Sequence, residues 1–224
     1  MSLEPPSTLP VTDRTRVRRL PARAVFDRAA IYAILDEAFV CHVAFAVDGQ
    51  PYAIPTGYAR LHDALYLHGS AASRMVRQLS AGVDVCVTVT LLDGLVLARS
   101  AFHHSVNYRS AVVLGRARLV TGLEEKRAAL RQFTNHVVPG RWDELRPITD
   151  QEIKSNAVLA LPIEEASAKV RTGPPLDDAD DLHWPVWAGV VPLSTRAGTP
   201  RADAHVLPGQ TPFDPERLRQ RGRA

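Results

Sequence analysis

The 224-residue sequence has only two cysteines and no long apolar run. Cys41 and Cys86 are each flanked by apolar and β-branched residues, where a thiol usually behaves as a small buried hydrophobe. This usage fits a reducing compartment. No apolar run approaches the roughly 20 residues that span a bilayer, and the N-terminus has no apolar segment for secretion. We therefore expect a cytoplasmic protein that does not associate with membranes.

The sequence also lacks a strong charge imbalance. The formal net charge is +3, and most basic residues are interspersed with acidic ones. Binding to a phosphate backbone requires a more concentrated basic surface, so we do not expect a nucleic acid partner. With 46% hydrophobic and 23% charged residues, the composition is that of a globular domain with a substantial core.

Several catalytic and cofactor motifs are missing. No GxGxxG follows a strand-like segment, GxSxG is absent, and neither cysteine has the surroundings of an exposed thiolate. The adjacent His103 and His104 lack cysteine or carboxylate ligands at a usable spacing, so we expect no metal site. These absences argue against a dinucleotide fold of the common type and against a nucleophile triad.

The hydrophobic pattern predicts a mainly β protein. Helices are expected at 26–39, from the serines before Arg74 to Gly82, and at 123–139, with a further helical turn at 150–156. Strand-like runs flank Asp48-Gly49 as a hairpin, and ALYLH follows them. Further strands are expected on either side of a break at Asp93-Gly94, then in NYRSAVVLGRARLV, AVLALPI and SAKVRTG. Because most connections are too short for crossover helices, we predict an antiparallel barrel with peripheral helices.

The domain boundaries follow from composition. We expect an extended N-terminal segment at 1–22, a β-barrel domain at 23–193, and a flexible tail rich in Pro, Gly, Arg and Asp at 194–224.

Two polar stretches interrupt this apolar pattern. In YLHGSAASRM, a strand ends near His68 and a helix begins within a few residues, so backbone N–H groups and the hydroxyls of Ser70 and Ser73 gather beside Arg74. Such a turn can bind a phosphate, but helix capping alone would also explain one serine. In HHSVNYRS, Arg109 and Ser110 could present donors at the barrel mouth, or the stretch could be a solvated loop.

Taken in order, PYAIPTGYA, YLHGSAASRM and NYRSAVVLGRARLV resemble segments of the pyridoxamine 5'-phosphate oxidase-like flavoproteins. The chain is most similar to the branch related to nitroimidazole-resistance proteins, over about residues 16–193. The resemblance implies a split β-barrel, a homodimer and FMN bound between the subunits. It also implies an oxidoreductase acting on a small molecule such as a nitro compound or a quinone. The alternative is a flavin- or haem-binding protein that stores or senses its ligand without turnover.

The resemblance also implies roles for individual residues. His68 is the candidate catalytic residue, and it could equally be only a neighbour of the cofactor. The implied FMN-binding set follows the three segments in order: Ala53, Ile54, Pro55, Thr56, Leu67, His68, Ser70, Ser73, Arg74, Tyr108, Arg109 and Ser110. Two departures count against true pyridoxamine phosphate oxidation: Met75 stands where the oxidases have a lysine, and DLHWPVWAGVVPL lacks their substrate-binding arginines.

Overall fold

Alternating apolar residues place one face of each long strand in a common core. In β2 (Val40–Val47) the buried residues are Cys41, Val43 and Phe45, while the residues between them face outward. The same period of two buries alternate valines of β6 (Asp84–Leu97). This alternation is the pattern of a sheet with one face packed against a core.

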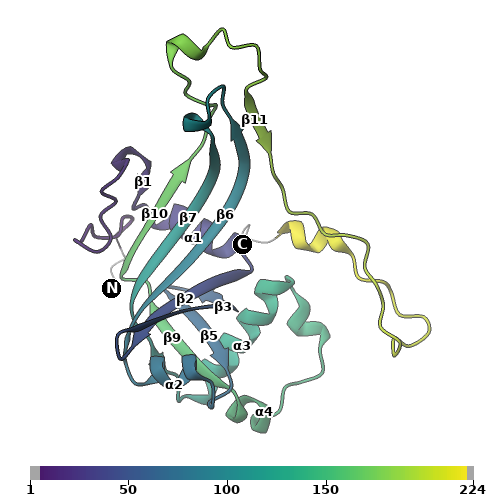
Figure 1. Cartoon of the computed structure of the whole chain (residues 1–224). Coiled ribbons are helices and arrows are strands. Elements are labelled where there is room, and N and C mark those ends of the chain that lie inside the picture. Colours follow the sequence, from purple (N-terminus) through teal and green to yellow (C-terminus); the bar gives the residue numbers. More distant parts are fainter. Residues whose placement is uncertain (1–5, 221–224) are drawn as a thin grey trace.

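The computed structural model describes residues 6–220, and in this range the strands form two antiparallel sheets with four α-helices around them (Figure 1). The larger sheet has the order β1-β10-β7-β6-β2-β3, with β11 added to β6, and the smaller has the order β4-β5-β9-β8. This architecture is consistent with a split barrel. The remaining strand bounds are β1 (Ala24–Val25), β3 (Gln50–Gly57), β4 (Ala59–Leu61), β5 (Ala64–Gly69), β7 (Ser105–Arg116), β8 (Arg118–Leu119), β9 (Ala157–Pro162), β10 (Glu165–Arg171) and β11 (Gly189–Pro192).

The predicted helices are present, and side-chain caps explain where three of them begin. The helices are α1 (Arg28–Glu37), α2 (Arg74–Ser80), α3 (Leu123–Val137) and α4 (Asp150–Ser155). The side-chain caps are those of α1, α2 and α4. Asp27 accepts a hydrogen bond from the Ala30 amide at 2.8 Å, and Thr149 forms a reciprocal capping box with Glu152. Short 3-10 turns lie at Pro21–Arg23, Ala101–His103, Arg141–Glu144, Ala179–Asp181 and Pro215–Gln220.

The predicted strand break at Asp93-Gly94 is wrong. β6 runs through both residues, and its pairing with β7 only shifts register between Leu92 and Gly94. The glycine has a different purpose here: a Cβ at Gly94 would lie 3.1 Å from the Val191 carbonyl oxygen of β11. Close approach of a neighbouring strand, rather than a turn, therefore explains this glycine.

The segments outside the expected barrel also contact it. Leu9 is buried within the main core cluster, and its amide donates a hydrogen bond to the Phe26 carbonyl at 2.8 Å. At the other end, Arg217 donates to the Pro139 carbonyl at 2.7 Å. Residues 1–5 and 221–224 of the predicted terminal segments lie outside the described range. No helix within residues 6–220 is long and apolar enough to cross a membrane.

Candidate functional site

Strand β3 connects two side-chain contacts of the predicted site. At its start, the Tyr52 ring lies under the Arg74 guanidinium, 4.6 Å from ring centroid to Cζ. At its end, Gly57 faces the Phe133 ring, and that ring packs edge-on against His68 with 4.2 Å between centroids. Ala53 to Thr56 thus run between Arg74 and the neighbourhood of His68.

Side chains of this segment alternate between the barrel and its surface. Ile54 and Thr56 are half-buried and pair in register with the core residues Val43 and Cys41 of β2. Ala53 and Pro55 are exposed on the opposite face. Within residues 6–220, β3 is the last strand of the larger sheet, so the backbone of this segment has one edge without a strand partner.

The turn between β5 and α2 carries the predicted phosphate site. Ser73 caps α2 by accepting a hydrogen bond from the Val76 amide at 3.2 Å, and Ser70 accepts one from the Ala72 amide, also at 3.2 Å. The capping interpretation is therefore confirmed, but it uses the hydroxyl oxygens only as acceptors. Each hydroxyl keeps its proton for donation to a bound anion.

Arg74 is exposed beside these serines. Among residues 6–220, its guanidinium has the Tyr52 ring as a neighbour and forms no ion pair with a carboxylate. An arginine stacked on an aromatic ring keeps its N–H donors at the edge of the guanidinium plane. The turn can therefore offer two hydroxyls and a charged fork to a phosphate.

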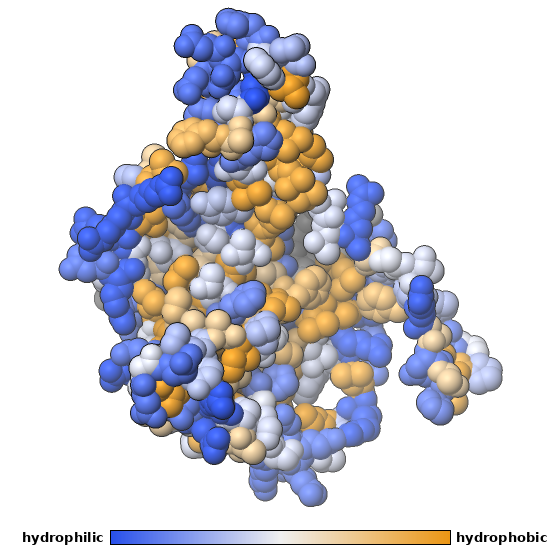
Figure 2. Space-filling model, viewed as in Figure 1, coloured by the Kyte–Doolittle hydropathy of each residue, from blue (hydrophilic) through white to orange (hydrophobic). Residues whose placement is uncertain are grey.

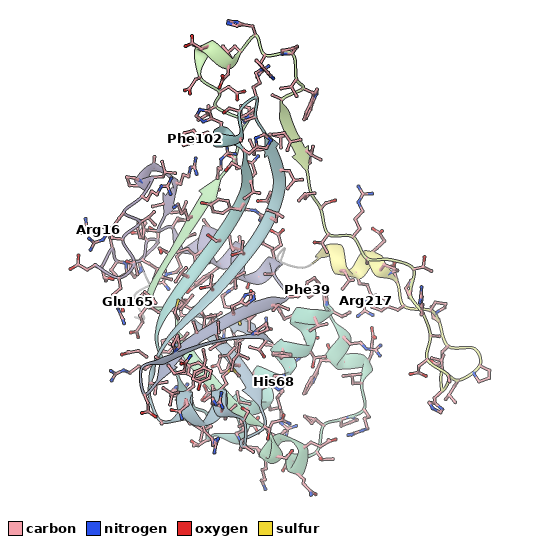
Figure 3. The ribbon with its side chains drawn as sticks, viewed as in Figure 1. Arg16, Phe39, His68, Phe102, Glu165 and Arg217 are labelled. Atoms are coloured by element: carbon pink, nitrogen blue, oxygen red, sulfur yellow. The ribbon has the colours of Figure 1, made fainter. Side chains whose placement is uncertain are left out.

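His68 lies half-buried in β5, and its ring packs against Phe133 of α3; Figure 3 labels its position in the molecule. Burial lowers the pKa of the imidazole, so the neutral form is favoured. Within the described residues neither ring nitrogen has a hydrogen-bond partner, and Phe133 supplies the aromatic contact. A neutral imidazole with free nitrogens can hydrogen-bond a cofactor or ligate a metal ion.

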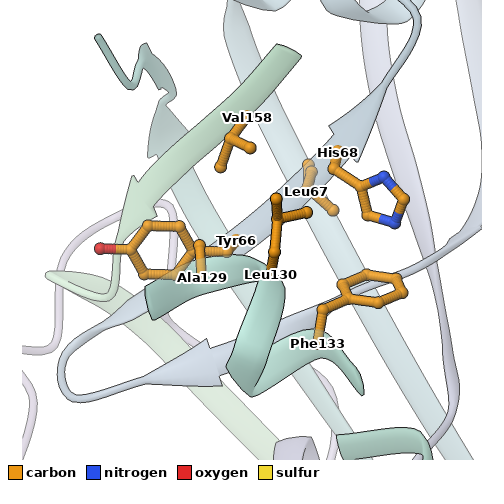
Figure 4. A pocket seen from close by; sticks show the side chains of 7 residues that line it. All are labelled: Tyr66, Leu67, His68, Ala129, Leu130, Phe133 and Val158. Atoms are coloured by element: carbon orange, nitrogen blue, oxygen red, sulfur yellow. The ribbon is translucent and has the colours of Figure 1, made fainter. Parts of the chain in front are cut away.

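Apolar residues surround His68 on the side of α3. The pocket is lined by Tyr66, Leu67, His68, Ala129, Leu130, Phe133 and Val158 (Figure 4). Leu67 is buried here, with its side chain in the core. The empty volume of the pocket, about 160 Å³, includes open solvent and leaves no room for an enclosed water molecule, so a flavin ring does not fit inside it.

The last group of predicted site residues lies apart from β3 in the larger sheet: Tyr108, Arg109 and Ser110. They belong to β7, which β6 and β2 separate from β3. Arg109 binds Asp93 through Nε and Nη2 at 3.0 and 2.8 Å, and it also binds Glu37 through Nη2 at 2.9 Å. The Ser110 hydroxyl donates to the Lys169 carbonyl at 3.2 Å. A single chain therefore does not bring these three residues to the other predicted site residues.

Two aromatic residues of the site were not predicted. Tyr52 supports Arg74, and Phe133 covers His68. Tyr52 lies within the quoted strand segment, so its position was visible in the sequence, but its pairing with Arg74 depends on the packing of the barrel on α2. Phe133 was assigned only to the apolar side of its helix.

Comparison with known proteins shows which family the chain belongs to. The pyridoxamine 5'-phosphate oxidase family matches residues 27–170. The chain belongs to this family. Among curated proteins, none matches the chain significantly.

Three solved structures similar to this chain include a flavocytochrome and an FAD and haem binding protein. The flavocytochrome Anf3 from Azotobacter vinelandii is 43% identical, with 94% of this chain and 97% of that chain covered and a TM-score of 0.85. The FAD and haem binding protein from Mycobacterium smegmatis is 38% identical, with coverage of 86% and 94% and a TM-score of 0.81. A protein from Bacteroides thetaiotaomicron, described as a candidate for 5-nitroimidazole antibiotic resistance, is 26% identical, with coverage of 66% and 86% and a TM-score of 0.56.

Proposed function

We propose that this family member is a flavin-dependent oxidoreductase whose flavin phosphate binds at the turn between β5 and α2. The observation that carries the proposal is the Arg74 guanidinium, stacked on Tyr52 beside two serine hydroxyls and without a carboxylate partner in the described chain. Sequence identity to a flavocytochrome and to an FAD and haem binding protein supports it.

The residues present fit a flavin. Ser70, Ser73 and Arg74 would hold the phosphate, while the ring system would lie along the free edge of β3, which ends the larger sheet in the described chain. A bound flavin supplies hydride or single-electron transfer. The protein would orient it and exclude water from one face. We predicted FMN from the sequence; FAD shares the same phosphate, and the M. smegmatis relative favours FAD.

We further propose that the site is completed by a second copy of the chain. Tyr108, Arg109 and Ser110 lie two strands away from β3, so they would serve a flavin bound by a partner subunit. The small volume of the pocket beside His68 supports this, because one chain does not enclose a flavin there. The substrate that we propose is a small electron acceptor such as a nitro compound or a quinone.

Haem binding is a second candidate function, favoured by His68. Its imidazole is half-buried, its pKa is lowered, and apolar residues of α3 and β9 line its surroundings. A neutral histidine with free ring nitrogens suits a haem iron as a ligand. Because the pocket does not hold even a flavin ring, the haem would lie outside it or displace Phe133 from His68. In this role, His68 would bind the iron rather than donate protons, and the low pKa favours that role over general acid catalysis.

The absorption spectrum of the purified protein tests both functions. We expect the bands of oxidised flavin and, if His68 ligates haem, a Soret band that His68→Ala removes while the flavin bands persist. A colourless protein that takes up neither added FMN, added FAD nor haemin would overturn the proposal. Repeated reduction by NADH or NADPH and reoxidation by a nitroaromatic or quinone would distinguish an enzyme from a storage or sensing protein.

A further inference from the structure

A projecting arm extends from the barrel at the distal ends of β6 and β7. We define the arm as residues 92–107 together with the returning segment 172–192, which ends in β11 (Figure 1). The two parts are firmly joined: Asp177 accepts hydrogen bonds from the amide and Nη1 of Arg99, both at 2.8 Å, and β11 pairs with β6. The Asn107 side-chain Nδ2 donates to the Gly173 carbonyl at 3.1 Å.

This braced arm exposes large apolar side chains. Phe102 is 89% exposed, Trp184 66% and Trp187 63%. Leu92, Leu95 and Val191 extend the apolar surface down the arm, and Figure 2 shows hydrophobic residues gathered on this upper part of the molecule. Aromatic residues exposed together on a rigid support are typical of a protein interface.

The arm also carries acidic residues without partners. In the 3-10 turn Ala179–Asp181, Asp180 and Asp181 precede Trp184 closely in sequence. Asp178 pairs with His103 at 3.1 Å, whereas within residues 6–220 the Asp180 and Asp181 carboxylates have no ion pair. The arm thus presents carboxylates and an indole ring, the two groups that arginine binds best in proteins.

A matching basic surface lies beside β10. We define the strap as residues 6–23, in which the Thr8 bridge to Asp27, the buried Leu9 and the Arg14–Glu165 ion pair hold the backbone in place. Arg16, Arg18 and Arg19 of the strap are exposed, and Figure 3 shows Arg16 at the outer side of the molecule.

These strap arginines differ from most others in the protein. Twelve arginines of the described chain form ion pairs with carboxylates. Arg16, Arg18 and Arg19 have no such partner within residues 6–220. Arg23, at the end of the strap, adds a further positive charge. Burial is the largest cause that lowers the pKa of Arg171, and the charge of nearby Arg23 is the second. Although the strap also contains the exposed Asp13, its three exposed arginines form no ion pair with a carboxylate in the described chain.

We infer that the arm of one chain binds the strap of a second copy, with Asp180, Asp181 and Trp184 on Arg16, Arg18 and Arg19. The occupant is a second copy because the arm and the strap supply complementary chemistry within one sequence. In a twofold dimer such a contact occurs twice, since each chain contributes its arm to the strap of the other. The inference rests on the self-association proposed above and assigns the surfaces that form it.

We call the contact between the arm of one chain and the strap of the other the clasp. Reciprocal charge reversal tests it. R18E/R19E and D180R/D181R each place like charges in both clasps of their own homodimer, so we expect each variant to dimerise at least about tenfold more weakly. An equimolar mixture restores opposite charges in both clasps of the heterodimer. Sedimentation velocity on a concentration series and native mass spectrometry of the mixture measure these effects, with R196E/R201E, two exposed tail arginines, as the control of equal charge change.

The clasp is supported if the mixture forms heterodimers well above the statistical share and the control dimerises like the wild type. It is overturned if the wild type is monomeric, if both variants dimerise like the wild type, or if the mixture shows no preference. Far-UV circular dichroism verifies that the variants fold. Flavin affinity, measured on the same samples, separates the two proposals. If the wild type binds flavin and the charge-reversal variants dimerise like it, only the clasp is rejected. If the wild type does not bind flavin, the proposed function is rejected.

Discussion

The Arg74 guanidinium lies over the Tyr52 ring at 4.6 Å, and this contact links the edge strand β3 to the start of α2. The stack holds a flexible cationic side chain beside Ser70 and Ser73 without using its N–H groups. The site is thus organised before any ligand binds, and its binding strength should depend on the ring as well as on the charge.

Tyr52→Leu should weaken flavin binding severalfold, because Arg74 loses the aromatic face that orients it. Tyr52→Phe keeps the ring and should bind flavin like the wild type. Fluorescence titration of the apoprotein with FMN and with FAD measures both variants. Equal affinities for the leucine and phenylalanine variants would show that the stack does not contribute to binding.

Gly57→Ala should disturb the contact between Phe133 and His68. An added Cβ would lie 2.9 Å from Phe133 Cζ, so the ring must shift. Overpacking of this kind costs about 1–3 kcal/mol in the free energy of unfolding. Urea denaturation of G57A, F133L and the double variant checks this: the glycine substitution should cost less in the F133L background, and strict additivity would contradict the proposed contact.

The stability of the protein should depend on the protonation of His68. Burial lowers its pKa in the folded state, whereas the unfolded chain titrates near about 6.5. As pH falls below about 6.5, the unfolded state therefore takes up the proton first, and the folded state loses stability until the folded pKa is passed. Above that range, the imidazole is neutral in both the folded and the unfolded state, so His68 no longer makes the stability depend on pH.

His68→Gln removes this titration. The free energy of unfolding of the wild type, relative to that of H68Q, should decline between about pH 7.5 and about pH 5. Denaturant melts of both proteins across this range measure it. A difference that stays constant with pH would show that the imidazole does not titrate differently in the folded state.

The two cysteines should differ in reactivity. Cys41 is fully buried in β2, and desolvation raises its pKa to about 12, so little thiolate is present at neutral pH. Cys86 is only partly buried and lies on the outer face of the sheet. Alkylation of the native protein at about pH 8, followed by peptide mass spectrometry, should label Cys86 and spare Cys41 until denaturant is added. Rapid labelling of Cys41 in the native state would contradict this burial.

Local signals in the sequence predicted much of the fold. The hairpin at Asp48-Gly49, the Asp27 cap and the serine-rich start of α2 depend on neighbouring residues, and all three are present. The same kind of signal failed at Asp93-Gly94, because β11, almost a hundred residues later, pairs along this part of β6. Pairing with a strand that is distant in sequence gives Gly94 a structural role other than a turn. A short window of sequence does not reveal such pairing.

The candidate site shows the same division. Ser70, Ser73 and Arg74 were predicted together because they are adjacent in sequence, and their arrangement in one turn follows from the start of a helix. The stack on Tyr52 and the cover of Phe133 over His68 arise from packing between distant elements. Arg109 shows the converse: its guanidinium binds Glu37 and Asp93, partners that no local pattern indicates.

The most direct test of the flavin site is the affinity of Arg74→Gln for flavin, with Arg77→Gln as a control. Arg77 lies one turn further along α2 and is also exposed, so both changes remove one charge from the same helix. Charge-assisted hydrogen bonds contribute roughly 1.5–3 kcal/mol, so R74Q should bind flavin at least about tenfold more weakly, while R77Q stays close to the wild type. If R74Q binds flavin as tightly as R77Q and the wild type, the phosphate does not bind at this turn.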